Sequence, residues 1–208
     1  MRVTDSLEQD HRIIEIMLPA VQRLGQRAQF TWQEQAPAQQ EAFDKDGAEM
    51  AVGFLRTFVD GYHHGKEELH LFKAMERRGV HRDVGLVFHL LEEHGRGRRH
   101  VRAMSDSLAT LRSGDAASLR STSAGAAEGK PEAAKAFADN AIAYVKLLGH
   151  HIREEDAELW PLVGRVLSED DDARLMESFA QVEGTVMGEG GREPFRAQAQ
   201  QIDGRVGP

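Results

Sequence analysis

Apolar side chains recur along this chain at intervals of three and four residues, which places them on one face of an α-helix. Alternation of polar and apolar positions, the pattern of a β-strand, is almost absent. Two segments rich in small or polar residues, 26–40 and 113–130, are typical of connections between helices. The pattern predicts four long helices, at approximately residues 4–25, 39–78 and 82–112 and, for the last, from Pro131 onward.

Four long helices with one apolar face each predict an all-α fold, an antiparallel up-down four-helix bundle. We assign this bundle to residues 1–167. The remainder, 168–208, is predicted to hold a short extra helix from Asp171 to about Val186, followed by a Gly-rich polar tail. The pattern leaves two alternatives for the tail after Met187: a mobile segment, or a short helix docked on a partner.

The composition narrows the classes of partner. The chain has 208 residues, a formal net charge of −8 and no cysteine. The negative charge argues against nucleic-acid binding, and the lack of thiols means that a bound metal would need nitrogen and oxygen ligands. The apolar runs are too short to span a membrane, and the first residues lack the apolar stretch of a signal peptide. A cytoplasmic protein that contacts neither nucleic acid nor membrane is therefore expected.

Two short segments of the chain resemble each other. When they are aligned on the leucine and aromatic residue near their ends, His63 corresponds to His151 and Glu67 to Glu155. Each segment thus carries a histidine four residues before a glutamate. Residues separated by four positions lie above one another on the same face of an α-helix. Each segment is therefore predicted to direct an imidazole and a carboxylate toward one point, as helical bundles do when they hold a transition metal.

Each of the four predicted helical faces carries one histidine, and two also carry a glutamate. Polar groups at such core positions are costly to bury unless they find partners. Imidazole and carboxylate ligands without sulfur suit iron, manganese, zinc or copper, and six ligands exceed the need of a four-coordinate zinc site. The set fits two metal ions that the carboxylates bridge and the histidines cap. The predicted metal ligands are His11, His63, Glu67, His94, His151 and Glu155.

Other histidines lie beside these faces rather than on them. His64 with Glu68, and His150 with Glu154, are also separated by four residues, and we predict both to be solvated surface pairs. The pair of His150 and Glu154 is the alternative register for the fourth helix. His89 falls off the apolar face of the third helix and is not predicted as a ligand.

In the order and spacing of these motifs the chain resembles the hemerythrin-like family, the HHE cation-binding domain. The resemblance runs from His11 through the two His-x3-Glu segments to His94 and covers about residues 1–167. It implies a non-haem centre of two iron ions, oxo- or hydroxo-bridged, inside a four-helix bundle. It also implies a small ligand, because such proteins bind or sense dioxygen, nitric oxide, peroxide or iron itself.

The chain departs from the oxygen-carrying hemerythrins at two positions. Those proteins place a His-x3-His pair on the third helix, where this chain has Arg98 as the second residue. Their last helix carries an aspartate five residues after its histidine, whereas here Glu155 follows His151 by four. The predicted site is one histidine poorer, which argues against reversible oxygen carriage. Arg98 has two alternative roles, either to stabilise a bound anion or peroxide or to pair with a carboxylate near the surface.

The sequence leaves several functions open beside a metal-binding or sensing protein. The same centre in an enzyme with oxidase or peroxidase-like activity is the main alternative, and it needs an open coordination position and a path for substrate. A ferritin-like di-iron protein needs two Glu-x-x-His motifs, of which only Glu67 with His70 is present. A metal-free helical interaction module is the fourth possibility.

Overall fold

The computed structural model of the protein describes residues 1–31, 43–118, 130–188 and 191–207, which form helices and short connections without a β-strand. Of the two predicted connections, 26–40 and 113–130, residues 32–40 and 119–129 lie outside the described residues, whereas 26–31 and 113–118 are helical. The elements are α1 (Arg2–Thr31), α2 (Lys45–Phe54), η1 (Leu55–His64), η2 (Glu67–Leu71), α3 (Phe72–Arg77), α4 (Gly85–Ser118), α5 (Lys130–Glu154), η4 (Glu155–Leu159), α6 (Trp160–Val166), α7 (Glu169–Val186) and α8 (Glu193–Val206).

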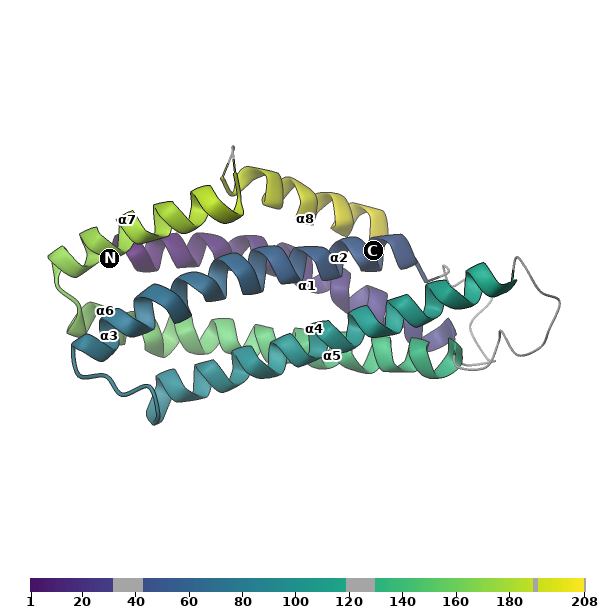
Figure 1. Ribbon diagram of the computed structural model, residues 1–208, viewed down its shortest axis with the longest axis horizontal. Helices are drawn as coiled ribbons and strands as arrows, with labels where there is room; N and C mark the ends of the chain where they lie inside the picture. The colour runs from purple at the N-terminus through teal and green to yellow at the C-terminus, as the bar shows by residue number, and fades with distance from the viewer. Residues whose placement is uncertain (32–42, 119–129, 189–190, 208) are drawn as a thin grey trace.

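The helices form four long rods, and α7 and α8 lie along one side of them (Figure 1). The first rod is α1, the second runs from α2 to α3, the third is α4 and the fourth runs from α5 to α6. Helix α5 packs against both α1 and α4. The predicted all-helical fold is therefore confirmed, and the arrangement of the rods is consistent with a four-helix bundle. No helix in the described part of the chain is long and apolar enough to cross a membrane.

The elements η1, η2 and η4 are π-helical turns within the second and fourth rods. A π-helical turn is wider than an α-helical turn, because its hydrogen bonds join residues five apart. Consecutive side chains are therefore separated by a smaller rotation about the axis. These turns contain or adjoin the two His-x3-Glu segments, so they decide which side chains enter the core there.

The apolar core is divided into two clusters along the rods. On α1 the division falls between Leu7 and Ile13, and on α4 it falls between Leu90 and Val101. Both pairs are buried, and so are Asp10 and His11 on α1 and Glu93 and His94 on α4, which lie between them. A layer of polar side chains therefore interrupts the core at one level and is closed on both sides by apolar side chains.

The C-terminal residues fold onto the rods. Helix α7 begins with a capping box, in which the side chains of Ser168 and Asp171 each bond the other's backbone N–H. Helix α8 packs against α1 and α2, and its Ala199, Ile202 and Val206 are fully buried in the larger apolar cluster. The tail, whose state the sequence left open, thus contains a helix that is docked on its own chain.

Candidate metal centre

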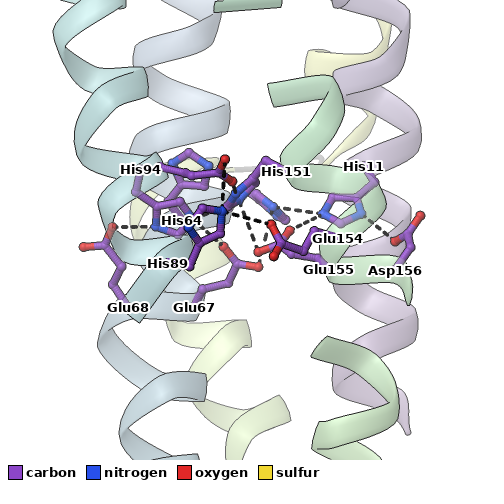
Figure 2. Close-up of polar contacts among 12 residues, drawn as sticks. His11, His64, Glu67, Glu68, His89, His94, His151, Glu154, Glu155 and Asp156 are labelled. Carbon is purple, nitrogen blue, oxygen red and sulfur yellow. Dashed lines mark hydrogen bonds and ion pairs between the residues drawn. The ribbon is translucent and has the colours of Figure 1, made fainter. Parts of the chain in front are cut away.

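The polar layer contains all six residues that the sequence singled out. They come from all four rods, because α1 supplies His11, η1 and η2 supply the second rod's pair, α4 supplies His94, and α5 with η4 supplies the fourth rod's pair. Each of the six is at most 1% exposed. Figure 2 shows five of them converging between the helices.

The ligand atoms form two groups, within each of which all atoms lie less than 4.8 Å apart. Glu67 belongs to both groups. Glu155 also reaches both, because its Oε2 lies 3.1 Å from His11 Nε2 and its Oε1 lies 3.2 Å from His151 Nε2. The two glutamates thus lie between the groups, where bridging carboxylates would be needed. The first group is His11, His63, Glu67 and Glu155, and the second is His64, Glu67, His94 and His151.

Four of the imidazole rings direct the same atom, Nε2, toward the interior. His11 Nε2 lies 3.2 Å from His63 Nε2, and His94 Nε2 lies 3.0 Å from His151 Nε2. The Nε2 atoms of these four rings therefore face the middle of the layer. Nitrogen atoms that converge in this way on carboxylate oxygens form the donor set of a nitrogen–oxygen metal site.

The outward nitrogen, Nδ1, of each of these rings faces a second carboxylate. A carboxylate accepts hydrogen bonds only, so it holds the proton on Nδ1 and leaves Nε2 free to bind a metal. The separations are 3.0 Å for His11 and Asp156, 3.4 Å for His63 and Asp10, 2.8 Å for His94 and Glu68, and 2.9 Å for His151 and Glu93.

The four supporting carboxylates share an arrangement that could not be predicted from the sequence. Each is the direct neighbour of a predicted ligand on its own helix, yet it holds a histidine of another helix. Asp10 precedes His11 but contacts His63, and Asp156 follows Glu155 but contacts His11. The acidic residue beside each ligand was visible in the sequence, but its partner depends on how the rods pack.

His64 is a further member of the layer, and the prediction that it pairs with Glu68 on the surface is wrong. Its side chain is buried, and its ring stacks on that of His94 with 3.8 Å between centroids. Neither ring nitrogen has a hydrogen-bond partner. The π-helical turn η1 explains the difference, because the smaller rotation between neighbours lets both His63 and His64 face the core.

Several buried polar atoms in this layer lack partners. Both carboxylate oxygens of Glu67 and Oε1 of Glu155 accept no hydrogen bond. Such orphaned groups are costly in a core. Burial and the neighbouring Glu155 raise the pKa of Glu67 well above its ordinary value. Divalent cations would satisfy these oxygens and one ring nitrogen of His64, whose Nδ1 lies 3.7 Å from Asp60, so the residues present fit a metal centre.

The histidines differ in protonation. Although burial opposes it, hydrogen bonds to Asp156 and Glu155 raise the pKa of His11 to about 9. Likewise, against the effect of burial, the charge of Glu155 raises the pKa of His151 to about 10. Burial lowers the pKa of His63 to about 3. Each close pair of Nε2 atoms therefore holds a proton that a metal ion would displace.

A buried ionic cluster supports the first group of ligands. Lys66 is fully buried, and its Nζ contacts Asp10 and lies 4.0 Å above the ring of Tyr62. Arg192, which precedes α8, donates from Nε to Asp10 across 2.6 Å. Two cations therefore fix the carboxylate that holds His63, and one of them comes from the C-terminal segment.

A cavity of about 440 Å³ approaches the second group from the side of α4. Its lining includes His64, Arg98, Arg102 and Tyr144. Arg98 does not enter the layer: its NH1 lies 2.8 Å from Asp60 and 2.9 Å from Glu68. Of the two alternatives for Arg98, the structure therefore shows carboxylate pairing, and Glu68 in turn holds His94.

Comparison with known proteins supports the same conclusion. The sequence model of the hemerythrin HHE cation-binding domain matches residues 2–163. The chain belongs to this family. The HHE domain is a cation-binding domain, so family membership and the buried His/Glu groups agree that the layer is a site for metal ions.

Relatives of this HHE protein occur in mycobacteria. It is 25% identical over 203 residues to uncharacterized proteins of Mycobacterium tuberculosis and Mycobacterium bovis. The alignments cover 98% of this chain and 69% of each relative. No solved structure gives a significant match.

Proposed function

We propose that this HHE protein is a non-haem di-iron protein that binds or senses a small ligand, namely dioxygen, nitric oxide, peroxide or iron itself. The observation that carries the proposal is the set of buried metal-ligand atoms without a hydrogen bond on Glu67, Glu155 and His64. They lie among four imidazoles whose Nε2 atoms converge. The proposed scaffold is an antiparallel up-down four-helix bundle, and the packing of α5 between α1 and α4 supports it.

Each of the two groups of ligands would bind one of the two ions. His11 and His63 would hold the first ion, and His64, His94 and His151 would hold the second. Glu67 and Glu155 would be shared. In this assignment His64 compensates for the histidine that Arg98 replaces on α4, so the number of nitrogen ligands equals that expected of an oxygen-carrying site with five histidines.

Two iron ions at this place would supply ligand binding and one-electron redox chemistry. The chain's own residues prepare the site for this. The supporting carboxylates Asp10, Glu68, Glu93 and Asp156 fix the rings of four ligand histidines. The apolar clusters on both sides of the layer keep bulk water out, and the cavity beside His64 gives a small molecule access.

The cavity also favours the alternative of an enzyme with oxidase or peroxidase-like activity. An enzyme requires a path by which its substrate can reach the metal centre. The lining of the cavity includes the arginines Arg98 and Arg102 and the carboxylates of Asp60 and Asp106, so polar molecules fit its chemistry. Consumption of hydrogen peroxide by the iron-loaded protein, and not by the metal-free protein, would support this function.

Metal content of ligand variants tests the proposal. Glu67→Ala removes the carboxylate common to both groups, and His151→Ala removes a ligand of the second group. Both variants should lose iron, whereas His81→Ala, which changes an exposed histidine between α3 and α4, should retain it. Azide should change the visible absorption of the iron-loaded wild type. If Glu67→Ala folded and kept two irons, the proposed ligand set would be wrong.

A further inference from the structure

A second cluster of metal-ligand residues lies outside the polar layer, where α4 and α5 face each other. It consists of His89 and Glu93 on α4 and His150 and Glu154 on α5. Ligand atoms of His89, Glu93 and Glu154 all lie within 4.8 Å of one another. Figure 2 shows His89 and Glu154 beside the inner residues. None of these four side chains is among the proposed ligands of the di-iron centre.

The separations in this cluster are those of metal ligands rather than of hydrogen bonds. His89 Nε2 lies 3.5 Å from Glu93 Oε1 and 3.4 Å from Glu154 Oε2. Both exceed the usual hydrogen-bond range, and Glu154 Oε2 is a buried atom without a hydrogen-bond partner. Ligands about 2.0–2.1 Å from a tetrahedral zinc ion are separated from one another by roughly 3.4 Å.

His150 can complete the set. Its Nδ1 lies 3.9 Å from Glu93 Oε1 and 3.8 Å from Glu154 Oε2, the same two oxygens that face His89. The two carboxylates give the cluster a negative charge that favours a cation. The two imidazoles select a transition metal over magnesium or calcium, which prefer oxygen ligands.

We propose that His89, Glu93, Glu154 and His150 form a separate, mononuclear site for a divalent first-row transition-metal ion. The site is open to solvent on its histidine side, because the side chains of His89 and His150 are 49% and 61% exposed. Its carboxylates face inward, and the Glu93 side chain is only 5% exposed. An ion from solution can therefore meet the imidazoles first and the buried oxygens next.

The position of the site links it to the inner layer. Glu93 directs Oε1 toward the outer cluster and Oε2 toward His151 Nδ1, at 2.9 Å. One carboxylate thus serves an outer ion and a ligand histidine of the inner centre. The outer site nevertheless depends only on its own four side chains and not on the proposed di-iron function.

Zinc titration tests the outer site. Zn²⁺ is added to the iron-loaded protein in a calorimeter, and iron and zinc are counted afterwards by elemental analysis. The test variant is His89→Ala with His150→Ala, and the matched control is His70→Ala with His81→Ala, which removes two histidines outside the cluster. We expect the wild type and the control to bind one zinc per chain at this site. The test variant should bind it at least tenfold more weakly, with unchanged iron content.

A second variant, Glu154→Gln, keeps the size of the side chain and removes its charge, and it should also weaken zinc binding. Equal zinc binding by the wild type and the His89/His150 variant would overturn the proposal, as would the absence of a bound zinc in the wild type. A protein that lacks iron but loses one equivalent of zinc in the test variant would contradict the di-iron function and support the outer site. The two proposals therefore fail separately.

Discussion

Replacement of Asp10 by asparagine should strongly destabilise the metal-free protein. Asp10 is fully buried and contacts Lys66, which is also fully buried, Arg192, and the imidazole of His63. These partners hold the pKa of Asp10 well below its ordinary value against the effect of burial. Asparagine keeps the shape of the side chain but removes its charge. The ammonium group of Lys66 is then left in the core without a counter-charge.

The magnitude follows from the burial of the partners. At a separation of about 3 Å and an effective dielectric constant of about 20, one charge pair is worth about 5 kcal/mol. Asparagine retains a carbonyl acceptor, and the Arg192 side chain, which is 21% exposed, regains some hydration. The expected loss is therefore about 3–5 kcal/mol, as for other buried ion pairs that lose one partner. Such a loss is a large part of the stability of a typical domain.

Urea unfolding of the metal-free protein, followed by circular dichroism, measures this loss. The matched control is Asp139→Asn, which removes an exposed ion pair with Lys135 and should cost no more than about 0.5 kcal/mol. The double variant Asp10→Asn with Lys66→Met removes both buried charges and should be more stable than Asp10→Asn alone. With Lys66→Met alone, these variants complete a double-mutant cycle. A coupling free energy between Asp10 and Lys66 below about 0.5 kcal/mol would refute the reasoning.

Three further predictions concern the second ion, the protons and the C-terminal helix. His64→Ala should weaken binding of one of two irons at least tenfold and leave the other bound, as counted after dialysis; two tightly held irons would exclude His64 as a ligand. Because the pKa values of His11 and His151 are raised to about 9 and 10, both rings are protonated at pH 7 without metal. Anaerobic ferrous loading should therefore release at least two protons, since Glu67 also has a raised pKa, and should tighten as the pH rises toward 9, whereas no release in a pH-indicator assay would contradict this. Ile202→Ala should cost about 2–5 kcal/mol in urea unfolding, and a cost below 1 kcal/mol would mean that α8 is not part of the core.

The periodic pattern of apolar residues was sufficient to predict the all-helical fold, but it did not predict where the individual helices begin and end. The predicted start of the second rod near residue 39 lies outside the described residues; within them α2 begins at Lys45, where Asp44 accepts a hydrogen bond from the backbone of Gly47. The C-terminal helix had a signal that its glycine-rich surroundings concealed. Ala199, Ile202 and Val206 recur at intervals of three and four residues and are fully buried.

The spacing of residues along the sequence predicted only part of the candidate site. The rule of four residues brought His63 with Glu67 and His151 with Glu155 to one layer, but it assumed α-helical geometry. The π-helical turn that also turns His64 inward has no signal in hydrophobic periodicity. The supporting carboxylates and the outer cluster depend on contacts between rods, which a single sequence does not specify.

The most direct test of the account is the metal content of the wild-type protein. The protein is purified without a metal-affinity tag from cells grown with added iron, and its metals are counted by elemental analysis. The account predicts about two irons per chain held by the inner layer, with Glu67→Ala losing them. A stably folded protein with no metal, or with a single zinc, would contradict the central claim, because the buried histidines and glutamates would then satisfy one another.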